Sequence, residues 1–65
     1  MYHNENMDYR GFYVTLETRS EFVYAFWCND NQEDSRKFSG YSMSEIKAII
    51  RQDIDDKLSL VTFGE

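Results

Sequence analysis

The sequence predicts one α+β domain, in which a single helix packs on one face of a three- or four-stranded antiparallel sheet. Three observations predict this class. The chain has 65 residues, which is room for one domain. Apolar and polar residues alternate over residues 11–18, as they do in a strand with one buried face. A helix-capping pattern at residues 42–45 is followed by apolar residues at intervals of three and four. The expected order is strand, strand, strand, helix, strand.

The first element is expected to be a β-hairpin. Residues 1–8 are polar and show no periodic apolar pattern, so we expect a mobile tail there, followed by the domain over residues 9–65. Strands are predicted over residues 11–18 and 21–28, where apolar and aromatic residues dominate. The short polar segment at residues 18–21 predicts a turn of about four residues between them.

This turn length predicts which residues of the hairpin share a face. The pairs expected opposite each other are Glu17 with Phe22, Leu16 with Val23, Val14 with Ala25, and Phe12 with Trp27. One face then carries Phe12, Val14, Leu16, Val23, Ala25 and Trp27. The other face carries Tyr13, Thr15, Glu17, Phe22, Tyr24 and Phe26, and it is unusually aromatic for a surface that meets water.

The second half of the chain is expected to contain a short strand, a helix and a final strand. Residues 29–34 lack an apolar member and predict a loop. A third strand over residues 35–39 would turn Phe38 inward. Ser42 and Glu45 match a capping box, with a helix running from there to about Lys57. Its apolar stripe consists of Met43, Ile46, Ile49, Ile50, Ile54 and Leu58. The apolar residues in 58–63 indicate a last strand or an apolar tail on the sheet edge.

Composition and charge exclude several classes of function. The chain has 12 acidic and 7 basic side chains, a net charge of −5, which argues against a protein that grips nucleic acid through its phosphates and favours a basic partner. No apolar run is long enough to span a membrane. Cys28 stands alone and cannot form an internal disulfide, which is typical of a reducing, cytoplasmic setting.

Enzyme chemistry is not expected. The single histidine, His3, lies in the predicted tail, so no nucleophile has a neighbouring base. Neither a cofactor nor a metal site is predicted, because the acidic residues 30–34 lack the glycine and the terminal glutamate of a calcium loop.

Two groups of residues are candidates for partner binding. The aromatic face offers Tyr13, Phe22, Tyr24 and Phe26, which fit a protein interface, a stacking platform for single-stranded nucleic acid, or a core that curls around both faces. The second group is Asp53, Asp55 and Asp56, placed near the expected end of the helix. Carboxylates are disfavoured there by the helix dipole, so a basic partner or solubility is the expected reason for them.

Residues 13–50 resemble the HicB-like antitoxin module. Tyr13, Thr15 and Glu17 approximate its first strand, and Gly40, Ser42 and Glu45 match its helix start, although the chain has no proline where that module has a proline-rich loop. The corner at residues 38–42 is also similar to that of small phage-encoded accessory proteins. The resemblance implies a small acidic protein that binds and neutralises another protein, and it carries over no catalytic residue.

We therefore expect a binding module that inhibits or modulates a partner protein, of the phage or mobile-element accessory kind, with antitoxin-like or anti-defence roles included. The alternatives are a single-stranded nucleic-acid-binding protein that uses the aromatic face, and a homodimer whose exposed faces bury one another.

Overall fold

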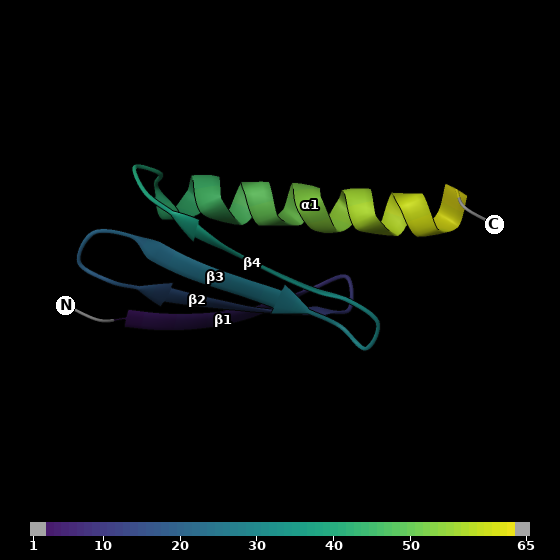
Figure 1. Ribbon diagram of the computed structural model, residues 1–65, viewed down its shortest axis with the longest axis horizontal. Helices are drawn as coiled ribbons and strands as arrows, with labels where there is room; N and C mark the ends of the chain where they lie inside the picture. Colours follow the sequence, from purple (N-terminus) through teal and green to yellow (C-terminus); the bar gives the residue numbers. More distant parts are fainter. Residues whose placement is uncertain (1–2, 64–65) are drawn as a thin grey trace.

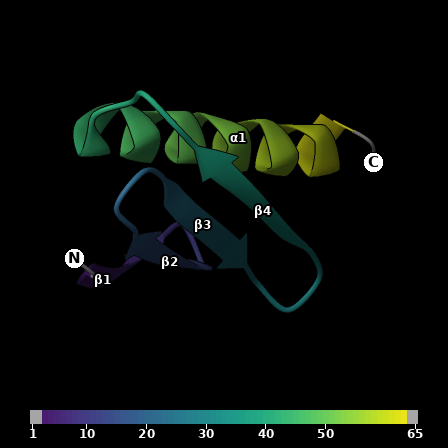
Figure 2. The same ribbon diagram turned by 60° about the vertical axis from the view of Figure 1, so that its left-hand side comes forward.

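The computed structural model describes residues 3–63, with side chains over residues 3–59. Strands β1 (His3–Tyr9), β2 (Phe12–Thr18), β3 (Val23–Cys28) and β4 (Glu33–Phe38) form one antiparallel sheet in the order β1-β2-β3-β4, and helix α1 (Met43–Phe63) follows. The helix forms a second layer over one face of the sheet (Figure 1). Figure 2 shows the same layers from a second side, with β4 leading into the start of α1. The predicted α+β class is confirmed, but the order is ββββα.

Strand β1 corrects the prediction of a mobile tail for residues 3–8, and residues 1–2 of that predicted tail lie outside the described residues. Residues 3–8 pair in register with β2, from His3 opposite Thr18 to Tyr9 opposite Phe12. The turn between the strands consists of Arg10 and Gly11, both with positive φ (49° and 87°), as a two-residue type I′ turn requires. The sequence of β1 is polar because the strand lies at a sheet edge, where most of its side chains are exposed to water.

The hairpin of β2 and β3 has the predicted faces and a different register. Leu16 lies opposite Ala25 and Thr18 opposite Val23, whereas the sequence predicted Leu16 opposite Val23. The turn is centred one residue later than expected, and the Arg19 amide donates to the Phe22 carbonyl at 2.8 Å. A slip of two residues leaves every side chain on its predicted face, because side chains alternate with a period of two.

Strand β4 begins earlier than predicted. It starts at Glu33, so the loop expected over residues 29–34 shrinks to a turn closed by Asn29. The Asn29 side-chain oxygen accepts hydrogen bonds from the backbone amides of Asn31 (2.8 Å) and Gln32 (2.9 Å), which is how asparagine stabilises tight turns. Phe38 points inward and is 2% exposed, as predicted.

Helix α1 begins as predicted and ends later. The Glu45 amide donates to Ser42 Oγ (3.2 Å), and the Ser42 amide donates to Glu45 Oε1 (2.8 Å), which confirms the capping box. The helix continues to Phe63, so the expected final strand over residues 58–63 is wrong. Its C-terminal end extends past the sheet (Figure 1). No helix among the described residues is long and apolar enough to cross a membrane.

The core lies between α1 and the inner face of the sheet, which is the face that points toward the helix. Every helix residue in it comes from the predicted apolar stripe. The buried side chains are those of Phe12, Val14, Leu16, Ala25, Trp27, Phe38, Ile46, Ile50 and Ile54. Half-buried side chains that pack against them are those of Met7, Tyr9, Val23, Met43, Ile49 and Leu58. One small core thus uses nearly all the aliphatic residues between positions 3 and 59, whereas the aromatic residues Tyr13, Phe22, Tyr24, Phe26 and Tyr41 lie outside it.

Candidate functional site

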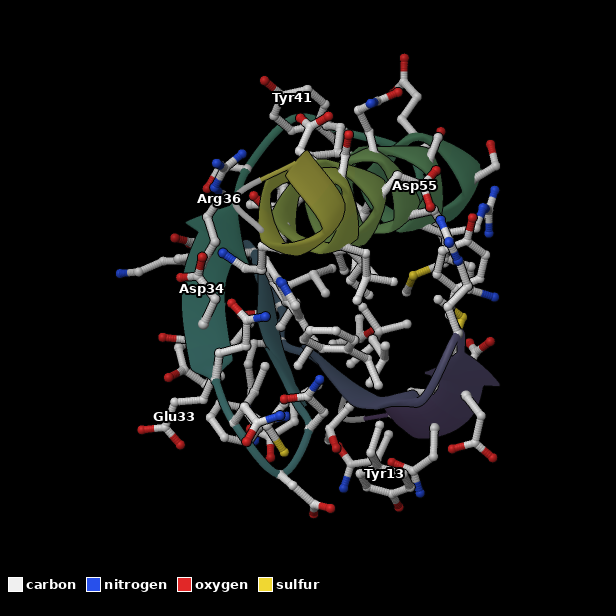
Figure 3. The ribbon with its side chains drawn as sticks, turned by 90° about the vertical axis from the view of Figure 1, so that its right-hand side faces the viewer. Tyr13, Glu33, Asp34, Arg36, Tyr41 and Asp55 are labelled. Atoms are coloured by element: carbon white, nitrogen blue, oxygen red, sulfur yellow. The ribbon has the colours of Figure 1, made fainter. Side chains whose placement is uncertain are left out.

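The outer face of the sheet points away from α1 and is the candidate functional site. Because side chains alternate along each strand, the pairing register places its residues in rows across the four strands. The first row is Asn4, Glu17, Tyr24 and Lys37. The second is Asn6, Thr15, Phe26 and Ser35. The third is Asp8, Tyr13, Cys28 and Glu33. No element of residues 3–63 covers this face, and Figure 3 shows Tyr13 pointing away from the helix.

Aromatic side chains occupy the middle of the outer face. Tyr13 is 49% exposed and Tyr24 is 40% exposed, while Phe26 is half-buried between them. Phe22 borders the group, with the Lys37 ammonium 4.8 Å from the centre of its ring. The structure therefore brings together the predicted aromatic residues Tyr13, Phe22, Tyr24 and Phe26 on one face.

Charged side chains surround this aromatic centre. Glu17 accepts a hydrogen bond from Arg19 at 3.0 Å, which offsets its charge locally. Asp8 and Glu33 lie on the two edge strands, and Lys37 lies on the same strand as Glu33. The outer face is thus apolar in its middle, with an acidic rim that contains one lysine on β4. The sequence interpretation missed Glu33, Lys37 and Cys28 as members of this face. Glu33 was missed because β4 was expected to start two residues later, whereas alternation along the predicted strands 21–28 and 35–39 already places Cys28 and Lys37 on the outer side.

The predicted aspartate group does not form one surface. Asp53 faces the sheet, where its carboxylate accepts a hydrogen bond from Trp27 Nε1 at 2.9 Å. Lys57 lies 3.3 Å from Asp53 and 3.2 Å from Asp34 on β4. Partial burial works to lower the pKa of Lys57, but hydrogen bonds to the two carboxylates outweigh it and raise that pKa. Asp53 is therefore part of the contact between helix and sheet.

Asp55 belongs to a second contact, on the β1 side of the helix (Figure 3). Its carboxylate accepts hydrogen bonds from Arg10 at 2.8 Å and from the Tyr9 hydroxyl at 3.0 Å. The bond from Arg10 lowers the pKa of Asp55, and the bond from Tyr9 adds to this effect. The same bond to Asp55 raises the pKa of Tyr9. These directions are those expected when a carboxylate is hydrogen-bonded in its charged form.

Asp56 alone of the three is exposed, and it accepts a hydrogen bond from Gln52 at 3.0 Å. The helix-dipole interpretation of the group also rested on a helix that ended near Lys57. Because α1 continues to Phe63, the three aspartates lie more than a turn from its end, and the dipole acts mainly within the terminal turns. The geometry explains Asp53 and Asp55 through their contacts in the fold.

An open hollow of about 420 Å³ lies at one end of the outer face. Its lining residues come from the β1–β2 and β3–β4 turns and the adjoining strand ends: Gly11, Tyr13, Cys28, Asn29, Asp30 and Asn31. The Asn29 oxygen is already bonded within its turn, and Cys28 is a free thiol. The hollow extends the outer face toward the turns.

Comparison of the chain with protein-family models, curated proteins and solved structures finds no match. The resemblance to the HicB-like module stays a prediction, and function has to be argued from the geometry above.

Proposed function

We propose that this protein is a binding module that inhibits or modulates a partner protein, and that the partner binds on the outer face. The observation that carries the proposal is the difference between the two sheet faces. The inner face is covered by α1, whereas Tyr13 and Tyr24 stand 49% and 40% exposed on a face that no element of residues 3–63 covers. Aromatic side chains gathered in the middle of a polar rim are typical of interface cores.

The charge of the face supports a partner of a particular chemistry. Asp8 and Glu33 stand on the two edge strands, and the chain as a whole has a net charge of −5. The complementary surface has an apolar centre and basic residues around it. Such a partner fits an acidic inhibitor of the antitoxin-like or anti-defence type, acting in the cytoplasm, where the free thiol of Cys28 stays reduced. No catalytic role is proposed.

Single-stranded nucleic acid fits the same face less well. Stacking platforms for bases work together with a basic groove that follows the phosphates, and here the rim is acidic apart from Lys37 and the Arg19 that pairs with Glu17. We expect no binding of single-stranded oligonucleotides at physiological salt. Measurable affinity in a salt titration would replace the proposed protein partner with nucleic acid.

The proposal is tested by a photo-crosslinking amino acid placed at Tyr24, with the same group at the exposed Gln52 of α1 as the control. In the cells that encode the protein, we expect one crosslinked protein other than the chain itself from position 24 and none from position 52. That protein is then purified, and its affinity is measured for the wild type and for Tyr24→Ala, Phe26→Ser and Gln52→Ala.

We expect the two outer-face variants to bind at least about tenfold more weakly, as central aromatic residues of interfaces do. Gln52→Ala should bind like the wild type. Equal affinity of all three variants would show that the partner binds elsewhere and would overturn the proposal.

A further inference from the structure

We infer that the outer face also binds a second copy of this chain, in one defined orientation. The inference rests on the proposed function, since it names an occupant of the same surface. What carries it is the order of charges on β4. Glu33, Ser35 and Lys37 all point outward, with the acid at one end of the strand and the base at the other. A strand with this order is complementary to a copy of itself that runs in the opposite direction.

The symmetry axis follows from the rows of the outer face. Two sheets pack face to face with their strands aligned to within about 30° and about 10 Å apart. Consider a twofold axis that lies between the two sheets and runs across the strands along the second row. It places each strand over the same strand of the second copy, which runs in the opposite direction. Glu33 then faces Lys37 of the second copy, and Lys37 faces its Glu33. The long side chains of lysine and glutamate meet across such a gap.

The same axis brings the aromatic residues together. Phe26 lies in the row on the axis, so it faces Phe26 of the second copy. Tyr24 faces Cys28 of the second copy, in the row on the other side of the axis. Asp8 faces Asn4 of the second copy and Glu17 faces its Tyr13, so no two like charges stand directly opposite each other. The half-buried Phe26 and the exposed Tyr24 thereby lose their contact with water.

The other face-to-face arrangement with aligned strands is disfavoured by charge. A twofold axis parallel to the strands, between β2 and β3, places β1 over β4 of the second copy. Asp8 would then face Glu33 of the second copy, and the symmetry would repeat this repulsion on the opposite side. Lys37 would face Asn4 and gain no ion pair. Like charges placed opposite each other disfavour a complex, so the axis across the strands is the arrangement that the outer face favours.

The size of the face sets the strength of the pair. Four strands spaced about 4.8 Å apart, each about 20 Å long, give a footprint of roughly 20 by 20 Å on each copy. This lies at the lower end of specific interfaces, where complexes are weak and transient. We therefore expect a dimer that dissociates in the micromolar range and leaves the outer face open to a stronger partner on dilution.

Charge-reversal variants test the orientation. The variants are Glu33→Lys, Lys37→Glu and the double variant E33K/K37E. The control is Asp56→Lys on α1, which changes the net charge by the same amount as Glu33→Lys but lies away from the outer face. Their masses are measured by sedimentation equilibrium from about 5 to about 500 μM, a range chosen to bracket a micromolar dissociation constant. Each single reversal should weaken the dimer by about tenfold or more, because two ion pairs become two like-charge contacts.

Mixing the variants gives the decisive outcome. Glu33→Lys carries lysine at both β4 positions, and Lys37→Glu carries glutamate at both, so an equimolar mixture should form a heterodimer of about twice the 7.8 kDa monomer mass. The double variant and Asp56→Lys should dimerise like the wild type. A wild type that stays at 7.8 kDa over the whole range, or a mixture no heavier than its components, would overturn the inference. Neither result would overturn the proposed function, because the crosslinking at position 24 tests it separately and does not depend on self-association.

Discussion

Asp53 and Asp55 hold α1 to the sheet by accepting hydrogen bonds from two aromatic side chains of the inner face. Asp53 accepts from the Trp27 indole and Asp55 from the Tyr9 hydroxyl, and each also pairs with a cation, Lys57 or Arg10. Buried aromatic residues with a polar group need such a partner. The two carboxylates thus accept hydrogen bonds from the Trp27 indole N–H and the Tyr9 hydroxyl, which are the polar groups that these two aromatic residues bring to the core.

Replacing Asp53 tests this role at the level of one residue. Asp53→Ala leaves the indole N–H of Trp27, a residue that is 1% exposed, without its acceptor, and an unsatisfied buried donor costs about 1 to 3 kcal/mol. Asp56→Ala is the matched control, since it makes the same helical substitution at an exposed position. We expect the free energy of unfolding in urea to be lower for Asp53→Ala than for Asp56→Ala by that amount. Equal values would show that Trp27 does not depend on Asp53.

The Arg10–Asp55 contact predicts a dependence of stability on pH. The pKa of Asp55 lies below its ordinary value of 3.8 because of the hydrogen bond from Arg10, so the unfolded chain takes up the proton more readily. The stabilisation by Asp55 is therefore complete above pH 3.8 and is lost as the pH falls through the lowered pKa. Asp55→Ala should unfold at lower urea concentration than the wild type at pH 7, and the difference should shrink at pH values below 3.8. A difference that is the same at both pH values would contradict this account.

At the level of elements, the start of α1 depends on a local signal that acts without tertiary structure. Ser42→Ala removes the acceptor of the Glu45 amide, and the loss of such a cap costs about 1 kcal/mol. Ser44→Ala, two residues further along and also exposed, removes only a 3.2 Å contact between the Ser44 and Ser42 hydroxyls and should change the free energy of unfolding by less than about 0.5 kcal/mol. Urea unfolding of the two variants measures this difference, and similar losses would mean that the cap at Ser42 does not stabilise the helix.

Strand β1 is the element that most needs an experimental test, because its sequence is polar. Its alternation predicts opposite effects at neighbouring positions. Met7 packs against the core, so Met7→Asp places a charge on the inner face and should destabilise the protein by about 2 kcal/mol or more. Asn6 faces outward, and Asn6→Asp should change stability by less than about 0.5 kcal/mol. Two variants with equal thermal unfolding midpoints would indicate that residues 3–8 do not pair with β2.

These elements also show which parts of the fold the sequence could predict. The faces of β2 and β3 were correct because alternation of Phe12, Val14 and Leu16 is strong, even though the register was wrong by two residues. Strand β1 was missed because an edge strand needs few apolar residues, and the signal that was overlooked is the glycine at position 11. The helix end was misplaced because the apolar residues after Leu58 were read as a strand, although no proline or glycine interrupts residues 43–63.

The candidate site was predictable to a similar extent. The aromatic residues Tyr13, Phe22, Tyr24 and Phe26 were placed together by alternation alone. The contacts of Asp53 and Asp55 were not predictable, because they join residues that lie far apart in the chain, and one of them involves the turn after the unexpected strand β1. Long-range partners of charged residues follow from the packing of helix on sheet, which local patterns do not encode.

At the level of the whole molecule, the fold is two layers thick and has one covered and one open sheet face. Its Cα extents are 45 × 20 × 14 Å, and the longest dimension reflects a helix that extends past the sheet (Figure 1). A small domain with a single core is marginally stable by itself. Burial of the outer face would therefore add to its stability.

This predicts that thermal stability depends on protein concentration. A second copy binds the folded chain and not the unfolded one, so self-association raises the unfolding midpoint as concentration increases. We expect a rising midpoint for the wild type over about 5 to about 500 μM. The midpoint of Phe26→Ser should be independent of concentration, since Phe26 lies on the proposed axis. Scanning calorimetry measures both, and parallel increases for the two proteins would place the self-association on another surface.

Trp27 gives the helix-covered face of the sheet an optical signal of its own. It is the one tryptophan of the chain, and it lies under α1 with its indole bonded to Asp53. Its fluorescence emission is therefore an intrinsic reporter of whether the helix is docked. Tyr13 and Tyr24 lie on the opposite side of the sheet. An unlabelled sample thus carries a probe for undocking of the helix that is separated by the sheet from a partner bound on the outer face.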